Sequence, residues 1–474
     1  MPVSDQYAPD PRLPLLGGEF ADPVQAADFP ELHLRWRNDR AAGSVGLGDL
    51  SDAEWREHFG RFRPLAGNLE TPLAQRYHGH QFRVYNPELG DGRGFTFAQL
   101  RETGTGRLLD LATKGSGVTP WSRSGDGRLT LKGGVREVLA AGLLEALGVP
   151  TSRAFSLIET GENLVRQDEP SPTRSAVLVR LSHSHIRYGT FQRPAALERP
   201  DLVRRLVDYT VDLYFPHLRG EADPGSALLQ EAARAAARLT AAWMAAGFVH
   251  GVLNTDNMNI TGESFDYGPY RFLPHSDPNF VAAYFDHAGL YSFGRQPEAV
   301  FWNLRQLAGC LMTAGSPEDA LVEVLNSFGD LYREALARAV VRRLGLLYRG
   351  DGSDARLVSA AFQALAAGGP AIRWEPFFFD WFCGDAARAL ASPRGAVHRG
   401  DAFDAFRREV AEATPDRPGR LAHPYFRRED PVELLIDGIE ALWAPIAERD
   451  DWSAFKATLA DIETAREALD LQPA

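Results

Sequence analysis

The chain has 474 residues, of which 44% are hydrophobic and 24% are charged, so it can bury a large core and divide into two or three lobes. Its net charge of −12 argues against the positive field that would hold nucleic acid. No window reaches the roughly 18 consecutive apolar residues of a membrane span, and the first residues do not resemble a secretion signal. We therefore expect a cytoplasmic, monomeric protein that binds neither nucleic acid nor membrane.

Short alternating or apolar runs begin at residue 82 and are separated by Gly, Pro, Asn and Asp. They cover residues 82–85, 95–100 and 107–112, and this spacing predicts an antiparallel meander. The segment 131–147 then carries apolar residues at helical spacing and stops at Gly148, which predicts a helix.

Two more strands are predicted at 152–158 and 175–181, so the N-terminal half should form a sheet with one helix on it. Beyond Pro200 the pattern becomes helical, over 202–215 and 227–247 and through most of the chain after residue 297. Only Cys310 and Cys383 occur, both in apolar surroundings, which predicts buried reduced thiols instead of disulfides or a zinc cluster.

This order of elements predicts an α+β fold of the bilobal, protein-kinase-like kind, with an N-terminal antiparallel sheet plus helix and a larger, mainly helical C-terminal lobe. We place an N-terminal extension at 1–75, the N-lobe at 76–195, and the C-lobe with its C-terminal helical extension at 196–474. Such a fold holds a nucleotide in the cleft between its lobes, although layout alone is weak evidence of function.

Lys114 ends a predicted strand, and Glu137 follows 23 residues later on the predicted helix. In kinase-like folds a strand lysine contacts nucleotide phosphates and is held by a helix glutamate, because an ammonium group in a cleft needs an oriented counter-charge. Lys114 and Glu137 fit this pair. The alternative is a surface lysine and an unrelated exposed glutamate.

The tetrapeptide GDGR occurs twice, at 90–93 and 125–128. Glycines let backbone N–H groups approach phosphate oxygens, and a neighbouring arginine adds a forked, charge-assisted contact; each copy is also a common tight turn. Arg180 and Arg187, seven residues apart after a strand, are either polyphosphate ligands or surface charges.

The segment HGVLNTDNMNI at 250–260 follows an apolar helix pattern, as the catalytic loop of a kinase does. Asn257 and, a few residues later, Asp266 in FDYG fill the positions of the two magnesium ligands. The catalytic aspartate of a kinase would stand five residues before Asn257, where this chain has Val252. The adjacent Asp256 is the candidate substitute base, unless it only fixes the loop.

Several long segments together resemble the selenoprotein O family (SelO, also called YdiU), which are protein adenylyltransferases with a pseudokinase fold. The resemblance spans most of residues 75–310. The matching segments are YHGHQF, GDGRG, KGSGVTPWSRSGDGR, GGVREVL, VRLSHSHIRYGTF, HGVLNTDNMNITGESFDYGPY and YSFGRQPEAVFWNLRQLA.

The resemblance implies that ATP binds inverted relative to a kinase, so that AMP passes to a protein Ser, Thr or Tyr hydroxyl and pyrophosphate leaves. It also implies that Asp256 accepts the proton, that Asn257 and Asp266 bind Mg²⁺ or Mn²⁺, and that Glu137 pairs with Lys114. The implied ATP-binding residues are Gly90, Gly92, Arg93, Lys114, Asp126, Gly127, Arg180, Arg187 and Asp266.

Many family members carry a cysteine or selenocysteine near the C-terminus, whereas this chain ends LDLQPA, so redox control through that position is not expected. Two other functions stay open from the sequence: a kinase that transfers the γ-phosphate with Asp256 as base, and a nucleotide-binding pseudokinase without catalysis. The sequence also does not decide between ATP and UTP as donor, or name the protein substrates.

Overall fold

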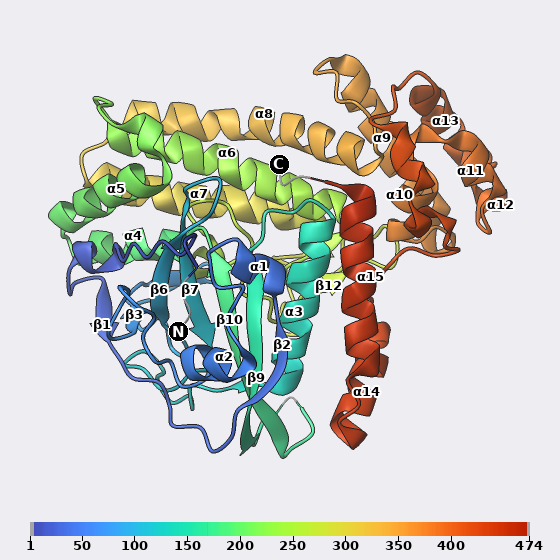
Figure 1. Cartoon of the computed structure of the whole chain (residues 1–474). Coiled ribbons are helices and arrows are strands. Elements are labelled where there is room, and N and C mark those ends of the chain that lie inside the picture. The colour runs from blue at the N-terminus through green and yellow to red at the C-terminus, as the bar shows by residue number, and fades with distance from the viewer. Residues whose placement is uncertain (1–3, 168, 472–474) are drawn as a thin grey trace.

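The computed structural model describes residues 4–167 and 169–471, and it places one large antiparallel sheet beside a larger set of helices (Figure 1). In this part of the chain the sheet has eight strands in the order β1-β3-β6-β7-β10-β9-β2, with β8 paired to β10. The strands are β1 (Ala21–Pro23), β2 (His33–Arg37), β3 (Leu73–Gln75), β6 (Thr96–Arg101), β7 (Leu108–Lys114), β8 (Leu129–Thr130), β9 (Arg153–Leu164) and β10 (Thr173–Ser182).

Both faces of this sheet are covered, as the alternation of side chains along β10 shows. Ala176 and Leu178 pack in the cluster that contains helix α3 (Leu131–Ala146). The alternate residues, Val177 and Val179, pack in a second cluster with α1 (Asp39–Gly43) and α2 (Asp52–Phe59). Successive side chains of a strand point to opposite faces, so a strand that is apolar throughout requires cover on both sides.

Helix α3 agrees closely with the helix predicted over 131–147. It begins where the Thr130 side chain accepts a hydrogen bond from the Gly133 backbone, and it stops just before Gly148, whose φ is 78°. The predicted strands at 95–100, 107–112, 152–158 and 175–181 are found as β6, β7, β9 and β10.

The prediction of a strand over 82–85 is wrong for its first half. Phe82 and Arg83 have φ values of 51° and 64° and form the turn between β4 (Gly79–Gln81) and β5 (Val84–Asn86). These two strands pair only with each other, apart from the large sheet. An apolar run does not reveal the left-handed backbone of a tight turn, which here falls on non-glycine residues.

Residues 1–75, which the sequence analysis set apart as an extension, contribute three strands to the large sheet. Strand β1 pairs with β3, and β3 pairs with β6. Strand β2 forms the opposite edge of the sheet by pairing with β9. The boundary proposed at residue 75 therefore falls within the hydrogen-bonded sheet.

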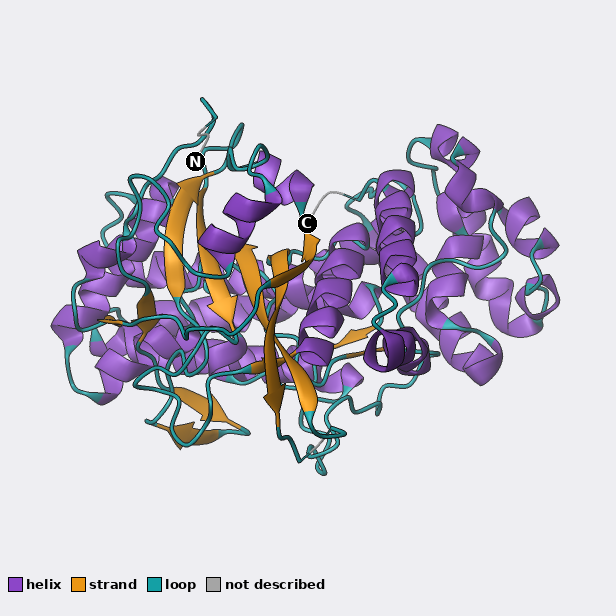
Figure 2. Ribbon diagram, turned by 60° about the horizontal axis from the view of Figure 1, so that its bottom comes forward, coloured by secondary structure: helices purple, strands orange, loops and turns teal. Residues whose placement is uncertain are grey.

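Helices dominate after residue 187. In Figure 2 the strands lie in the left and central part of the view among other helices, and the right-hand part contains helices and loops without strands. Helix α6 packs against α7 and α8. The helices are α4 (Tyr188–Ala196), α5 (Pro200–Tyr214), α6 (Pro224–Ala245), α7 (Gln296–Thr313), α8 (Glu318–Arg343), α9 (Gly352–Gly368), α10 (Trp374–Asp380), α11 (Ala386–Ala391), α12 (Gly395–His398), α13 (Asp404–Ala411), α14 (Ile436–Arg449) and α15 (Ser453–Leu469). A short hairpin, β11 (Phe248–Val249) with β12 (Arg271–Phe272), flanks the segment that carries the candidate loop.

The last helix returns to the sheet, because α15 lies along α3 (Figure 1). Asp450, between α14 and α15, forms ion pairs with Arg35 on β2 and Arg174 on β10. The C-terminal end of the chain thus supports the helix that carries Glu137.

Cys310 and Cys383 are both buried and unpaired, as predicted. Across the described residues, no helix is both long enough and apolar enough to cross a membrane.

Candidate active site

A cavity of about 600 Å³ brings most of the predicted site residues together. Both GDGR turns border it, and so do the ends of β7 and β10 and the loop after β11. The predicted residues in its lining are Gly90, Gly92, Arg93, Lys114, Asp126, Gly127, Arg180, Arg187, Asp256 and Asp266. Glu137 and Asn257 lie outside this lining, each next to a residue that belongs to it.

Lys114 is buried and stands between two carboxylates. Its Nζ contacts Glu137 Oε1 on α3 and lies 2.6 Å from Asp266 Oδ1. Because α3 packs on β9 and β10, its second turn is fixed relative to the end of β7, where Lys114 lies. The strand lysine and the helix glutamate therefore form the ion pair that their spacing predicted.

Two buried arginines approach the same aspartate from another side. Arg180 Nη1 lies 3.4 Å from Asp266 Oδ1, and Arg187 Nη1 lies 3.9 Å from Asp266 Oδ2. Burial alone would raise the pKa of Asp266, but the charges of Lys114, Arg180 and Arg187 hold it well below its ordinary value. Three cations thus converge on one carboxylate.

The arginines are fixed by aromatic rings and by backbone oxygens. Arg187 lies over the rings of Tyr77 and Phe265, at 4.6 and 4.8 Å from their centroids, and it donates a 2.9 Å hydrogen bond to the carbonyl of Asp256. Arg180 also faces Phe265. The Nε atoms of both arginines are buried without a hydrogen-bond partner among the described residues, so each guanidinium group has an unused hydrogen-bond donor.

His250 orients the segment that carries Asp266. The histidine is fully buried, and its Nε2 lies 3.0 Å from the carbonyl oxygen of Phe265. Burial lowers the pKa of His250, so the neutral ring donates this bond. Asp266 itself has a φ of 66°, and this local backbone turn aims its carboxylate at Lys114.

Asp256 lies in a short 3₁₀ turn, Thr255–Asn257, and its Oδ1 is buried with no hydrogen-bond partner in the described structure. Burial raises the pKa of Asp256 to about 6, against the opposing charge of Arg187. The residues around it are held firmly, since Thr255 Oγ1 accepts from the backbone of His80 and donates to Gln192. The loop therefore fixes the position of the carboxylate without forming a hydrogen bond to its Oδ1.

Asn257 is half-buried, and its Nδ2 donates a 3.0 Å hydrogen bond to the carbonyl of Val252. This bond assigns the amide nitrogen to the loop and leaves Oδ1 as the atom able to bind a cation. Val252, at the position where the sequence comparison with kinases would place an aspartate, contributes only its backbone carbonyl to this loop. The described residues contain no group of three or more His, Cys, Asp or Glu side chains able to hold a metal.

The first GDGR turn is built to touch the segment before the second one. A Cβ at Gly90 would lie 2.3 Å from the Trp121 ring, and one at Gly92 would lie 2.8 Å from the Trp121 carbonyl oxygen. Gly127 in the second turn has a φ of 68°, which a side chain rarely adopts. The glycines therefore have a packing requirement in addition to any role toward a ligand.

Two charged residues of the turns, Arg93 and Asp126, behave differently. Arg93 is exposed at the cavity. Asp126 pairs with Arg166 at 2.8 Å and accepts a hydrogen bond from the Arg128 backbone, so its carboxylate is already engaged.

Sequence reasoning missed three lining residues with visible roles. Asp91 lies 3.3 Å from Arg187, Tyr77 stacks on the same arginine, and Trp121 packs on Gly90. Asp91 and Tyr77 stand inside the quoted motifs GDGRG and YHGHQF, which was the available signal. Their partners lie about 100 residues away, so only the fold identifies the contact.

Comparison with known proteins adds independent information. The family model described as "Protein adenylyltransferase SelO" matches residues 4–463. A protein named protein nucleotidyltransferase YdiU from Synechococcus elongatus is 51% identical over 479 residues, covering 95% of this chain and 94% of the relative. Proteins of the same name from Synechocystis sp. and Gloeobacter violaceus are 43% and 45% identical, each covering 94% of this chain and 96% and 93% of their own lengths.

Proposed function

The chain belongs to the SelO family of protein adenylyltransferases, and from this premise we propose that it transfers AMP from ATP to Ser, Thr or Tyr hydroxyls of proteins and releases pyrophosphate. Nucleotidyl transfer to protein is the activity of the family. The hydroxyl acceptors and the residue roles are our proposal, and one observation carries it: Lys114, Arg180 and Arg187 converge on one carboxylate in a single cavity.

We place the reaction between the lobes of a kinase-like fold, with residues 76–195 as the N-lobe, 196–474 as the C-lobe and 1–75 as an extension whose strands β1, β2 and β3 complete the N-lobe sheet. The position of the cavity supports this arrangement. Its lining combines the ends of β7 and β10 with Asp256 and Asp266, which lie beyond residue 195.

The cations of the cavity suit a triphosphate. Asp266 lies close to Lys114, Arg180 and Arg187, and Asp91 adds a second carboxylate at Arg187, whereas a polyphosphate would supply further negative oxygens. The same cations would stabilise the charge that develops on departing pyrophosphate. We assign Gly90, Gly92, Arg93, Asp126 and Gly127 to contacts with the nucleotide.

Asn257 and Asp266 fit a divalent cation by their chemistry. Asn257 Oδ1 is left over by the bond to Val252, and Asp266 stays ionised because three cations lower its pKa. Hard oxygen donors with room for phosphates and water suit Mg²⁺, with Mn²⁺ as the alternative. When bound, the cation would neutralise phosphate charge and orient the α-phosphorus.

Asp256 is the proposed proton acceptor. The substrate hydroxyl oxygen forms a bond to the α-phosphorus of ATP, the bond from that phosphorus to pyrophosphate breaks, and the hydroxyl proton passes to Asp256. Its Oδ1 has no hydrogen-bond partner to displace among the described residues. A pKa raised to about 6 makes it a stronger base than an ordinary carboxylate while leaving it mostly ionised at pH 7.

The position of the label separates the possible reactions. Purified protein is incubated with Mg²⁺, a mixture of acceptor proteins and ATP labelled at either the α- or the γ-phosphorus. We expect protein-bound label only from the α position, with the modified Ser, Thr or Tyr located by mass spectrometry. Label from the γ position alone would identify a kinase instead.

Two further samples complete the test. α-Labelled UTP in place of ATP measures how far the site selects its base. The Asp266→Ala variant should lose transfer together with nucleotide-dependent metal binding. If the wild-type protein binds nucleotide but labels no acceptor from either position, the non-catalytic pseudokinase function is correct and our proposal is wrong.

A further inference from the structure

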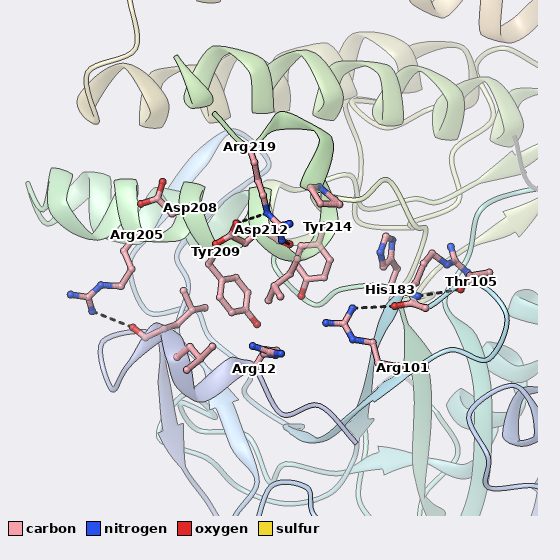
Figure 3. A pocket seen from close by; sticks show the side chains of 16 residues that line it. Arg12, Arg101, Thr105, His183, Arg205, Asp208, Tyr209, Asp212, Tyr214 and Arg219 are labelled. Atoms are coloured by element: carbon pink, nitrogen blue, oxygen red, sulfur yellow. Dashed lines mark hydrogen bonds and ion pairs between the residues drawn. The ribbon is translucent and has the colours of Figure 1, made fainter. Parts of the chain in front are cut away.

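A second large cavity, of about 770 Å³, is lined by other residues than the candidate active site, and Figure 3 shows the side chains that line it. It is bordered by the N-terminal 3₁₀ turn Leu13–Leu16, by the turn between β6 and β7, and by α5 with the segment after it. None of the described residues lines both cavities. Arg107 and Lys114 flank opposite ends of β7, which separates the two cavities by about 20 Å.

Arginines dominate the charged residues of this second cavity, although the chain as a whole is acidic. Its lining holds five arginines against two aspartates, and they are Arg12, Arg101, Arg107, Arg205, Arg219, Asp208 and Asp212. His183 adds no charge near neutral pH, since burial lowers the pKa of this residue to about 4. The lining therefore favours an anion.

Three of these arginines are already paired with carboxylates. Arg219 binds Asp212, Arg107 binds Glu102, and Arg101 binds Asp10. These groups shape the cavity and contribute to its field, but most of their donors are in use.

Arg12 is different, because Asp10 contacts only its Nε. Among the described residues its terminal nitrogens have no partner, so the outer edge of the guanidinium is available for a second anion. Figure 3 shows Arg12 and Arg101 on the side of the cavity that faces Tyr209 and Tyr214.

Two tyrosines supply the second, independent observation. The side chains of Tyr209 and Tyr214 are each 7% exposed, and both line the cavity. Their hydroxyl oxygens are buried, and neither makes a well-formed hydrogen bond among the described residues, although the two hydroxyl groups interact weakly with each other and with Gln99 and Ser184. Weak contacts of this kind leave hydrogen-bonding capacity beside the guanidinium edge, which an acceptor in the cavity would use.

Much of the remaining lining is apolar. Leu15, Leu16 and Leu213 line the same space, and Leu15 is 66% exposed at its mouth. A bare ion would leave these side chains in water, whereas a ligand with an apolar body would cover them.

We propose that this cavity is a second binding site, distinct from the catalytic one, for a small organic phosphate whose anionic group meets Arg12, Tyr209 and Tyr214 and whose apolar body lies on Leu15, Leu16 and Leu213. A phosphate fits better than a planar carboxylate, since its tetrahedral oxygens accept hydrogen bonds from several directions at once. This inference does not depend on adenylyl transfer.

Isothermal titration calorimetry of the full chain with phenyl phosphate tests the proposal. We expect one class of site that binds phenyl phosphate at least about tenfold more tightly than inorganic phosphate or benzoate. Equal affinity for inorganic phosphate would overturn the role of the apolar lining, and the absence of binding at millimolar concentrations would overturn the site.

Variants locate the bound probe. Arg12→Gln should weaken binding about tenfold and Tyr214→Phe about fivefold, because each removes donors to the phosphate. Arg63→Gln is the matched control, since it removes one positive charge from an exposed position of the same N-terminal segment and should bind as wild type. Thermal unfolding confirms that each variant is folded, and if Arg12→Gln is not, Tyr214→Phe decides.

Arg93→Gln tests whether phenyl phosphate binds in the candidate active site instead. It alters the candidate active site, so it should leave phenyl phosphate binding unchanged. If binding instead falls in Arg93→Gln and persists in Arg12→Gln and Tyr214→Phe, the probe occupies the catalytic cavity and the proposal is wrong.

Discussion

Two buried clusters of charged side chains in this protein are built in opposite ways. One is the proposed catalytic cavity, where Asp256 and Asp266 meet Lys114, Arg180 and Arg187. The other, the Asp380 cluster, lies among α10, α11 and α12 and contains Asp380, Ser392, Arg394 and His398. Figure 1 places these helices far from the sheet that borders the cavity.

The Asp380 cluster satisfies its own acceptors. Arg394 donates to both carboxylate oxygens of Asp380, at 2.8 and 2.9 Å, and Ser392 and His398 contact the same group. Trp381 Nε1 donates to His398 Nδ1 at 3.3 Å, so His398 Nε2 is the nitrogen that donates to Asp380. Nothing is left for a ligand.

The catalytic cavity, in contrast, is incomplete by itself. Asp256 Oδ1 has no partner in the described structure, and three cations share Asp266. A closed cluster contributes to stability, whereas an open one keeps binding capacity for a substrate at the expense of stability. Burial of charge alone therefore does not identify a functional site. Buried polar atoms that lack a hydrogen-bond partner, such as Asp256 Oδ1, are the better indicator.

The largest expected effect is that of Asp256→Ala on activity. We expect AMP transfer to fall by about 10³-fold, because a general base contributes on the order of 10²- to 10⁴-fold. The free energy of unfolding should change by less than about 1 kcal/mol, since no side-chain hydrogen bond of Oδ1 is lost. Initial rates with α-labelled ATP and denaturant unfolding measure the two effects. A large loss of stability with modest loss of rate would mean that Asp256 only fixes its loop.

Asp380→Asn should give the reverse result. Asp380 is 1% exposed, and its replacement leaves Arg394 without its buried counter-charge, which costs about 3 kcal/mol of unfolding free energy. The rate per folded molecule should not change. Chemical denaturation and kcat/KM at a temperature where the variant is folded test this, and a lowered kcat/KM in folded variant would contradict the division into two clusters.

The stability difference between wild type and Asp380→Asn should depend on pH in one direction. Burial opposes ionisation of Asp380, but Arg394 and His398 hold its pKa below the ordinary value. The wild-type carboxylate therefore contributes stability that is complete above its unfolded-state pKa of about 3.9 and is lost as pH falls through the lower folded-state pKa. Unfolding of both proteins across that range should show the difference shrinking with acid; a constant difference would exclude this cause.

The sequence predicted the open cluster well because its members are set by local spacing. Lys114 ends a strand and Glu137 lies in the second turn of a helix, and Asp256, Asn257 and Asp266 stand in one loop region. Each of these residues can be recognised from the sequence of the strand, helix or loop that contains it. Their convergence in one cavity is the part that depended on the resemblance to a family.

The contacts that the sequence could not predict join distant segments. Trp121 fills the space beside Gly90, and Asp91 reaches Arg187, although neither pair shares an element. The prediction of a strand over 82–85 was wrong for its first half for a different reason, since Phe82 adopts a left-handed backbone that no periodicity records. The contacts of Trp121 and Asp91 form only when segments distant in the sequence pack together, whereas the turn at Phe82 belongs to a separate pair of strands, β4 and β5.

A smaller effect on activity is expected from Glu137→Gln. The substitution keeps a hydrogen-bond acceptor near Lys114 but removes the charge, so Lys114 is held more tightly by Asp266 and less by α3. Transfer should fall on the order of tenfold, measured as kcat/KM for ATP. Glu145→Gln at the far end of the same helix is the control and should retain full activity. Equal losses in both variants would indicate damage to α3 and not to the ion pair.

The smallest effect is expected at Gly79, which borders the open cluster without contributing a charge. A Cβ there would lie 3.0 Å from Asp256 Oδ1 and 3.0 Å from the Leu89 side chain. In Gly79→Ala one of these neighbours must move by a few tenths of an ångström, and Asp256 is the less constrained because its Oδ1 has no partner in the described structure. We expect kcat to fall by about fivefold with little change in KM for ATP, since the base shifts while the phosphate ligands stay in place.

Gly438→Ala, on α14 with nothing within 4 Å of the added Cβ, is the control and should leave the rate unchanged. If Gly79→Ala lowers the unfolding free energy as strongly as Asp380→Asn does, then the space around Asp256 is closed in the same way as the Asp380 cluster, and the distinction between the two regions fails at the point where it matters most.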